Sequence, residues 1–474
     1  MPQTTPLNRR EFLRRVGVAG AAGVAAAAFP RGLFAAARPA RPPNFIVLFT
    51  DDQGYQDLGC FGSPDIKTPC IDRMAAEGMK FTDFYVASPV CTPSRSALMT
   101  GCYPKRVGLH QGVLFPNAQK GLNPDEITLA EMLKARGYAT MCIGKWHLGD
   151  NPKFLPTQQG FDSYFGIPYS NDMSITRDGK RGPPLMRNDQ IVEHPADQAT
   201  LTERYTEEAV QFIKANKDRP FFLYLPHTMP HLPLAVSERF KGKSAGGMYG
   251  DVIETIDWGT GRILDTVRTL GLQNDTIAIF TSDNGPWLSR KNDHNVGSAL
   301  PLRNGKGTTY EGGMREPCVM WGPGRIPAGT VCRELAATMD LFPTFAAMAG
   351  GTVPTDRVID GRDIGPLMRG EAGAKTPHDA YYYYSSGGRL EAVRAGNWKL
   401  HITRPAPPRP KKGQPAPPPA PPAAETVELY DLAADIGEAA SVADKHPDVV
   451  QRLKGMMETF DAELEKTARP VGTV

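Results

Sequence analysis

The stretch PNFIVLFTDDQG, residues 43–54, decides the fold that the rest of the chain continues. Its first part is a run of apolar and β-branched residues, which is typical of a strand buried on both faces. The run ends abruptly in Asp51 and Asp52, followed closely by a glycine. In an open α/β sheet the ligand crevice lies beyond the carboxyl ends of the strands. A buried strand that leads into an acidic loop is therefore expected to bring these two carboxylates to such an edge.

Strands and helices alternate along the following 240 or so residues, on the pattern that predicts a βαβ succession. TPCIDRMAAEGMKFTDFYV (68–86) indicates a helix, a glycine stop and a strand, and a long helix is expected around 248–270. The same rhythm recurs in ITLAEMLKARGYATMCIGKWHLG (127–149), FFLYLPHTMPHLPL (221–234) and TIAIFTSDNG (276–285). This alternation predicts an α/β fold with a large mixed, mostly parallel sheet flanked by helices.

The pattern changes beyond residue 375, where DAYYYYSS, LEAVRAG and NWKLHI indicate short antiparallel strands. An amphipathic helix is expected over 446–466. We therefore predict a catalytic domain over 38–375 and a smaller C-terminal α+β domain over 376–474. A proline-rich insertion, residues 404–424, lies between two expected strands and cannot pair in a sheet. Its composition favours a tolerated surface loop over a signalling ligand.

Composition limits the classes of partner. The 474 residues are 41% hydrophobic and 22% charged, which is enough for one large core and a smaller domain. The net charge is only +3, so nothing global points to nucleic acid or an anionic membrane. Any anion site must come from a local cluster of charges.

The N-terminus reads as a targeting segment. LNRREFLRRVGVAGAAGVAAAAF (7–29) joins Arg9 and Arg10 to a short Ala/Gly/Val run, and small residues suited to cleavage follow near Ala37. The run is too short and too weakly apolar for a membrane anchor. We predict that residues 1–37 are a twin-arginine signal peptide, read by the twin-arginine translocon of a bacterium. The mature chain is then expected in the periplasm or outside the cell.

Seven cysteines follow, and none forms a C-x-x-C pair, which argues against a zinc ribbon. Six of them are interpreted as buried thiols or unassigned disulfide halves: Cys60, Cys70, Cys102, Cys142, Cys318 and Cys332.

Acidic and amide side chains follow two expected strands at equivalent positions. Asp51 and Asp52 end the first, and Asp283 and Asn284 end a later one. Capping and turn formation would explain either pair alone. Both pairs together predict an oxygen-rich site for a hard cation, Ca²⁺ or Mg²⁺.

Basic side chains lie in the same set of loops, and a cation flanked by several of them would bind and polarise a tetrahedral oxyanion ester. A single histidine in such a loop is more often structural than catalytic. The candidates are Arg95, Lys145, His147, His227, His231 and Lys306.

SPVCTPSRSALMTG, residues 88–101, places Cys91 four residues before Arg95 at the start of an expected helix, with Pro93 in its first turn. Both side chains would lie near backbone N–H groups that suit an anion. From these residues alone, Cys91 is a thiolate nucleophile, a metal ligand, a disulfide half or a cysteine converted to another group.

C-T-P-S-R, together with TDD, GKWHLG, TSDNGP and GKGTTYEGG, resembles the type I, formylglycine-dependent sulfatases of the alkaline phosphatase superfamily. The resemblance covers roughly residues 43 to 470, and FTDFYV, GIPYSND and YYYYSSGGRLEAVRAGNWKLH are most similar to the arylsulfatase A and N-acetylgalactosamine-6-sulfatase branch. It implies that a formylglycine-generating enzyme oxidises Cys91 to Cα-formylglycine. One hydroxyl of the aldehyde hydrate would attack sulfur, and the other would later expel sulfate, which divides one hard hydrolysis into two easier steps.

The resemblance also assigns roles to the other residues. A cation, usually calcium, would be held by modified Cys91 and by Asp51, Asp52, Asp283 and Asn284. Arg95 and Lys145 would hold the hydrate, and His147 would take the proton of its second hydroxyl when sulfate is released. His231 and Lys306 match the pair beside the leaving oxygen, and Ser170 matches a serine that contacts sulfate. His227 has no secure counterpart and is expected on the substrate side.

The chain departs from the family pattern at DIGE (435–438), which replaces D-P-x-E and is expected to affect only a turn, and in the proline-rich insertion. The expected function is hydrolysis of a sulfate ester of a carbohydrate or aryl group. The alternatives are a phosphodiesterase or phosphonate monoester hydrolase of the same superfamily, and an inactive protein that binds sulfated glycans. A cysteine phosphatase is excluded because three residues between Cys91 and Arg95 are too few for its phosphate loop.

Overall fold

The computed structural model describes residues 41–288, 296–404 and 425–474. The predicted signal peptide, residues 1–37, lies outside these ranges, as do residues 405–424 of the proline-rich insertion.

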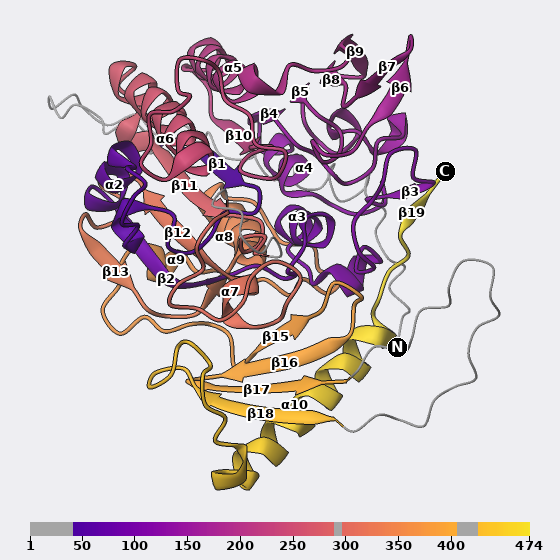
Figure 1. The fold of residues 1–474 in the computed structure, drawn as a ribbon, viewed down its shortest axis with the longest axis vertical. Helices are drawn as coiled ribbons and strands as arrows, with labels where there is room; N and C mark the ends of the chain where they lie inside the picture. The colour runs from indigo at the N-terminus through magenta and orange to yellow at the C-terminus, as the bar shows by residue number, and fades with distance from the viewer. Residues whose placement is uncertain (1–40, 289–295, 405–424) are drawn as a thin grey trace, which may run out of the picture.

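A mixed sheet of eleven strands runs through the larger part of the molecule (Figure 1). Ten strands follow one path, and β14 (Ala336–Ala337) pairs with β2 beside it. The order along the path is β13 (Thr330–Cys332), β2 (Met79–Tyr85), β12 (Arg315–Trp321), β11 (Thr276–Ser282), β1 (Asn44–Thr50), β10 (Phe221–Pro226), β4 (Ala139–Ile143), β5 (Ser163–Gly166), β8 (Leu185–Arg187) and β9 (Gln190–Glu193).

β1, the strand predicted from residues 43–50, lies at the centre of this sheet. β1 pairs in parallel with β10 on one side and with β11 on the other. β4 and β5 continue the parallel part, whereas β12, β8 and β9 pair antiparallel. The predicted mixed, mostly parallel sheet is confirmed.

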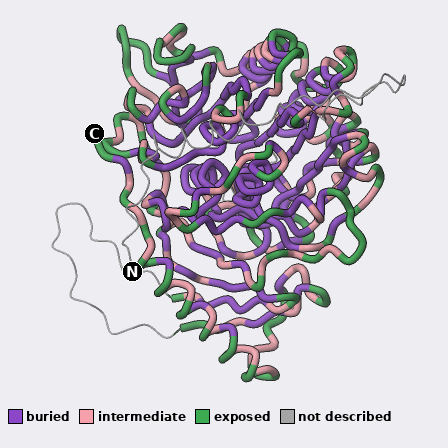
Figure 2. Tube along the Cα trace, turned by 180° about the vertical axis from the view of Figure 1, so that it is seen from behind, coloured by how far each residue is buried: buried purple, intermediate pink, exposed green. Residues whose placement is uncertain are grey.

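Helices cover both faces of the sheet, because β1 is apolar on both sides. Phe45, Val47 and Phe49 belong to one hydrophobic cluster, and Ile46 and Leu48 belong to another on the opposite face. The first cluster includes residues of α3 (Cys91–Thr100), α4 (Leu129–Lys134), α8 (Leu341–Met348) and α9 (Gly365–Met368). The second includes residues of α2 (Pro69–Ala76), α5 (Leu201–Ala215) and α6 (Gly247–Thr269). In Figure 2 the buried residues fill this layered interior, and most exposed residues lie on the periphery.

A four-stranded antiparallel sheet follows near the C-terminus, in the order β15 (Tyr381–Tyr384), β16 (Leu390–Ala395), β17 (Trp398–Thr403) and β18 (Thr426–Asp431). The helix α10 (Pro447–Lys466) packs against β16 and β17. β17 and β18, which flank the proline-rich insertion, pair directly, with Thr403 opposite Thr426. Figure 1 shows this sheet and α10 side by side below the larger sheet.

The shorter elements include α7 (Glu311–Met314), the hairpin β6 (Ile175–Arg177) and β7 (Lys180–Gly182), and the pair β3 (Lys120–Gly121) with β19 (Gly472–Thr473). All seven cysteines are free thiols, and Cys60 and Cys70 are half-buried whereas the others are buried. Among the residues described, none of the helices has the length and apolar character needed to cross a bilayer.

Candidate functional site

The carboxyl ends of β1 and β11 place the predicted acidic residues together. Thr50 and Ser282, the last residues of the two strands, are register partners, so Asp51 and Asp283 follow side by side. A cluster of buried side chains offers ligand atoms that all lie within 4.8 Å of one another, and its members are Asp51, Asp52, Cys91 and Asp283. The predicted convergence of two strand ends is thus confirmed.

Asn284 adjoins this cluster through its side-chain amide. Its Nδ2 donates to Asp52 Oδ1 at 2.7 Å and to the carbonyl oxygen of Gly285 at 3.0 Å. The Asn284 amide oxygen is buried, and no described residue donates a hydrogen bond to it. A buried acceptor without a donor is costly unless another partner, such as a cation, is present. The oxygen-rich donor set fits a hard divalent cation.

Each of the three carboxylates forms an ion pair with a different basic side chain. Lys145 Nζ lies 2.5 Å from Asp51 Oδ2, and Lys306 Nζ lies 2.7 Å from Asp52 Oδ2. Arg95 donates to Asp283 Oδ2 through Nε at 3.0 Å and through Nη2 at 2.7 Å. The three acids are thereby balanced, and a bound divalent cation would give the cluster a net positive charge that attracts an anionic ester.

The acids differ in protonation because their neighbours differ. Burial and the adjacent negative charge of Asp51 raise the pKa of Asp283 to about 7, against the opposing charge of Arg95. For Asp51, burial also favours the neutral form, but Lys145, His231 and Arg95 outweigh it and hold its pKa well below the usual range. Crowded buried carboxylates of this kind are stabilised by a divalent cation.

Cys91 is the first residue of α3, and Pro93 lies in the first turn of that helix, as predicted. Its Sγ lies 3.4 Å from Asp51 Oδ1, and the side chain is 1% exposed. A cysteine at a helix N-terminus usually has a lowered pKa. Here burial and the negative charge of Asp51 raise the pKa of the thiol instead, so the unmodified side chain is protonated and a weak nucleophile.

Lys145, His147 and Ser170 line the same buried region. Lys145 Nζ donates to Ser170 Oγ at 3.1 Å, and Ser170 is 1% exposed. His147 Nε2 lies 2.9 Å from the carbonyl oxygen of Leu114, which can only accept, so Nε2 carries the proton. His147 Nδ1 is buried without a described partner. Burial and the charges of Lys145 and Arg95 hold the pKa of His147 well below its usual value, so the imidazole is neutral with an available lone pair.

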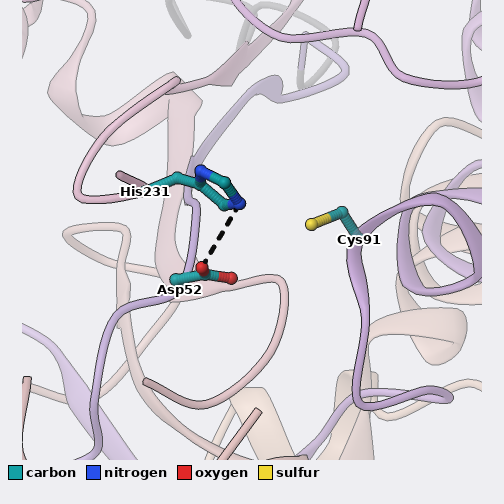
Figure 3. A group of neighbouring side chains, drawn as sticks. All are labelled: Asp52, Cys91 and His231. Carbon is teal, nitrogen blue, oxygen red and sulfur yellow. Dashed lines mark ion pairs between the residues drawn. The ribbon is translucent and has the colours of Figure 1, made fainter. Parts of the chain in front are cut away.

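In Figure 3, His231 lies beside Asp52, and both face Cys91. Its Nε2 is 3.6 Å from Asp52 Oδ2, and its Nδ1 donates to the carbonyl oxygen of Leu232 at 2.6 Å. Asp52, Cys91 and His231 offer atoms within 4.8 Å of one another. The structure therefore places His231, like Lys306, beside Asp52.

His227 is the predicted residue that no contact ties to the cluster. It is buried, burial lowers its pKa to about 3, and neither ring nitrogen has a described hydrogen-bond partner. Its substrate-side role stays a prediction.

Trp287 is a neighbour of the site that the sequence did not single out. Its ring lies 5.0 Å from Lys306 Nζ and 5.8 Å from the His231 ring. The sequence could have indicated this residue, because it follows Asn284 by three residues in the same loop after β11.

Comparisons with known proteins identify the relatives of this chain. A family model described as Sulfatase matches residues 43–351, and one described as C-terminal region of aryl-sulfatase matches residues 376–473. The chain is 39% identical to arylsulfatase A of Homo sapiens over 457 residues, which cover 90% of this chain and 89% of that protein. It is 43% identical to N-acetylgalactosamine-6-sulfatase of Canis lupus familiaris over 389 residues, which cover 78% and 73%.

Solved structures show the same fold. The PsFucS1 sulfatase from Pseudoalteromonas sp. matches with a TM-score of 0.78 and 27% identity, covering 91% of this chain and 92% of that one. Ps i-CgsB in complex with k-i-k-neocarrahexaose matches with a TM-score of 0.74 and 29% identity, covering 89% and 93%. The family model spans more than half of the chain and includes every residue of the cluster described above. The chain therefore belongs to the sulfatase family.

Proposed function

We propose that this protein is an exported hydrolase of carbohydrate sulfate esters that uses Cα-formylglycine, formed from Cys91, and a divalent cation. Family membership makes the chain a sulfuric ester hydrolase. The modification, the cation and the export route are the parts that we add.

The observation that carries the proposal is the position of the Cys91 sulfur. It lies within 4.8 Å of oxygens from Asp51, Asp52 and Asp283, in a group whose other members are hard oxygen donors. Hard cations such as Ca²⁺ prefer oxygen to sulfur. If position 91 carries an oxygen, as in a hydrated formylglycine, all the ligands offered to the cation are oxygens. A thiol at this position would instead offer sulfur. We therefore favour Ca²⁺, with Mg²⁺ as the alternative.

A bound cation would supply Lewis-acid polarisation of a sulfate oxygen. The residues of the chain supply the rest. Arg95 and Lys145 carry positive charge against the nucleophile and stabilise the negative charge that develops there. His147 offers the lone pair of Nδ1 to a proton from the nucleophile side, which suits a general base.

The leaving-group side is formed by His231 and Lys306. Both lie against Asp52, at 3.6 Å and 2.7 Å. Figure 3 shows His231 and Asp52 together, facing Cys91. Their placement suits protonation of the departing alcohol oxygen. Ser170, which accepts a hydrogen bond from Lys145, is proposed to contact the sulfate oxygens.

A sulfated carbohydrate is the substrate class that the comparisons support. One relative is named N-acetylgalactosamine-6-sulfatase, and one similar structure holds a neocarrahexaose. The exported location is supported by the paired Arg9 and Arg10 and the short apolar run after them. Because the twin-arginine route carries folded proteins, we expect the formylglycine-generating enzyme and the cation to act before translocation.

The direct test is turnover by protein produced together with a formylglycine-generating enzyme. We expect hydrolysis of 4-nitrophenyl sulfate well above that of a 4-nitrophenyl phosphodiester, and hydrolysis of at least one member of a panel of sulfated mono- and oligosaccharides. Cys91→Ala should abolish turnover while the protein stays folded. Faster hydrolysis of the phosphodiester would favour the superfamily alternative, and binding of sulfated glycans without turnover would favour an inactive binding protein.

A further inference from the structure

The loop of residues 303–311, which we call the Lys306 loop, is hydrogen-bonded to the C-terminal sheet at both of its ends. Lys306 stands near its middle and reaches Asp52. Within the larger domain, the backbone N–H groups of Lys306 and Gly307 donate to the carbonyl oxygens of Pro286 and Pro89, at 3.0 Å and 2.9 Å. The two ends of the loop have different partners.

Arg303 anchors the first end. Its Nη1 donates to Tyr430 Oη and to the carbonyl oxygen of Glu438, each at 2.8 Å. Its guanidinium also lies 3.9 Å from the centre of the Tyr310 ring, within the range of a cation–π contact. Arg303 thereby joins the start of the loop both to the C-terminal sheet and to the end of the same loop.

Thr309 and Tyr310 anchor the other end. Thr309 Oγ1 lies 3.0 Å from Glu391 Oε2 and 2.8 Å from His401 Nε2. Tyr310 Oη donates to Glu428 Oε2 at 2.7 Å, and its ring stacks on His401 with centroids 4.3 Å apart. Thr309 is 1% exposed, so its hydroxyl depends on these protein partners.

Glu311 closes the loop with a buried ion network. Lys399 Nζ lies 2.9 Å from Glu311 Oε1 and 2.8 Å from Glu438 Oε1, and the Lys399 and Glu311 side chains are fully buried. Glu438 Oε2 accepts the backbone N–H of Glu311 at 2.7 Å. Glu438 is the last residue of DIGE, so this motif holds the start of α7 as well as forming a turn.

The anchoring side chains share one face of the C-terminal sheet. Lys399 is the register partner of Tyr430, and His401 is the register partner of Glu428. Partners in an antiparallel pair point to the same face, and residues two apart do so as well. Four polar side chains on two adjacent strands are therefore directed at the Lys306 loop.

We propose that the C-terminal sheet is a positioning element for Lys306, and that Arg303 and Thr309 are the residues through which it sets the proton donor of the leaving group. This inference rests on the proposed function. The anchors do not touch the reacting atoms, so they act through Lys306. Loosening either end of the loop would leave the cation cluster and Cys91 in place and displace the donor.

The dependence on leaving group separates this role from a merely structural one. A nitrophenolate leaves readily without a proton, whereas a less acidic phenol needs the donor. Displacement of Lys306 should therefore slow the hydrolysis of poor leaving groups selectively. A general loss of folded protein would lower turnover of every substrate by the same factor.

The test compares Thr309→Val and Arg303→Gln with wild type on a series of 4-substituted phenyl sulfates, from nitro to methoxy. Thr309→Val keeps the shape and removes both contacts of the hydroxyl; Arg303 is partly exposed, so its variant is expected to fold. Met457→Ala is the matched control, because Met457 is a buried residue of α10, which packs against β16 and β17, and it takes part in none of the loop contacts described above.

We expect kcat for 4-methoxyphenyl sulfate to fall at least ~10-fold more than kcat for 4-nitrophenyl sulfate in both variants, which steepens the plot of log kcat against leaving-group pKa. The control should keep the wild-type slope. An unchanged slope in Thr309→Val and Arg303→Gln would overturn the proposal, whether or not overall activity falls. Failure of the proposed function is a different result, since wild-type protein would then not hydrolyse 4-nitrophenyl sulfate.

Discussion

Lys306 Nζ lies 2.7 Å from Oδ2 of Asp52, although 253 residues separate them in the chain. The pair joins the first strand end to a loop that the C-terminal sheet anchors. Asp52 thus faces the predicted cation on one side and the predicted proton donor on the other. The chemistry of the site depends on this contact being held in place.

Removal of the Lys306 charge is expected to act mainly on the leaving group. In Lys306→Met, kcat for 4-methoxyphenyl sulfate should fall roughly 10²–10⁴-fold, the usual contribution of a positioned proton donor. The loss for 4-nitrophenyl sulfate should be much smaller. Steady-state kinetics on the two substrates measures this, with the exposed Lys241→Met as a control that should match wild type. Equal losses on both substrates would remove Lys306 from the role of proton donor.

A divalent cation should stabilise the folded protein as well as support turnover. Chelation is expected to abolish activity, and Ca²⁺ should restore it. At a Ca²⁺ concentration of 100 times Kd, the free energy of unfolding should rise by about 2.7 kcal/mol. Calorimetry with and without Ca²⁺ measures the corresponding shift in Tm. In Asp52→Asn, Ca²⁺ should no longer raise the Tm. If neither Ca²⁺ nor Mg²⁺ changes the Tm of the wild-type protein, the assignment of these residues as cation ligands is contradicted.

The buried ion network of Lys399, Glu311 and Glu438 should contribute more to the free energy of unfolding than an exposed ion pair does. Lys399→Met leaves the buried carboxylates of Glu311 and Glu438 without their shared cation, which should lower the free energy of unfolding by about 3–5 kcal/mol. Lys454→Met, which breaks an exposed pair with Glu425, should cost no more than about 1 kcal/mol. Urea unfolding of both variants tests the contrast, and similar midpoints would refute it.

His378 should make stability depend on pH. Its Nε2 lies 2.8 Å from Asp340 Oδ1, and the side chain is 7% exposed. Burial opposes protonation, but the charge of Asp340 outweighs it and raises the pKa of His378 above 6.5. A histidine with a raised folded-state pKa contributes stability that is fully present below pH 6.5 and is lost as the pH rises through the folded-state value.

The measurement for His378 is the free energy of unfolding of wild type minus that of His378→Asn at a series of pH values. This difference should be largest in mildly acidic solution and should decline above pH 6.5. A difference that grows as the pH rises would show that His378 is neutral in the folded protein.

Much of the acidic cluster could be predicted because its assembly follows from strand order. Two buried strands that end in acidic residues and pair in parallel must place Asp51 and Asp283 side by side. Lys306 and His231 were candidates because of their loops, but their assignment to the leaving-group side followed only from the resemblance to sulfatases. They lie on long loops, and no local pattern fixes where a loop folds back.

The anchoring of the Lys306 loop was beyond prediction from the sequence. Glu311 and Lys399 stand in stretches that read as ordinary turn and strand, and charged residues at such positions are usually exposed. Their burial arises only when the C-terminal sheet packs against the loop. For the same reason DIGE was expected to affect a turn alone, whereas Glu438 also holds the N–H of Glu311.

The central claim is that the sulfur of Cys91 is replaced by oxygen. Mass spectrometry of the tryptic peptide FTDFYVASPVCTPSR, residues 81–95, from active enzyme tests it most directly. We predict a peptide whose mass corresponds to formylglycine at position 91, in a fraction that rises in step with specific activity. An active enzyme in which this peptide carries only unmodified cysteine would contradict the account.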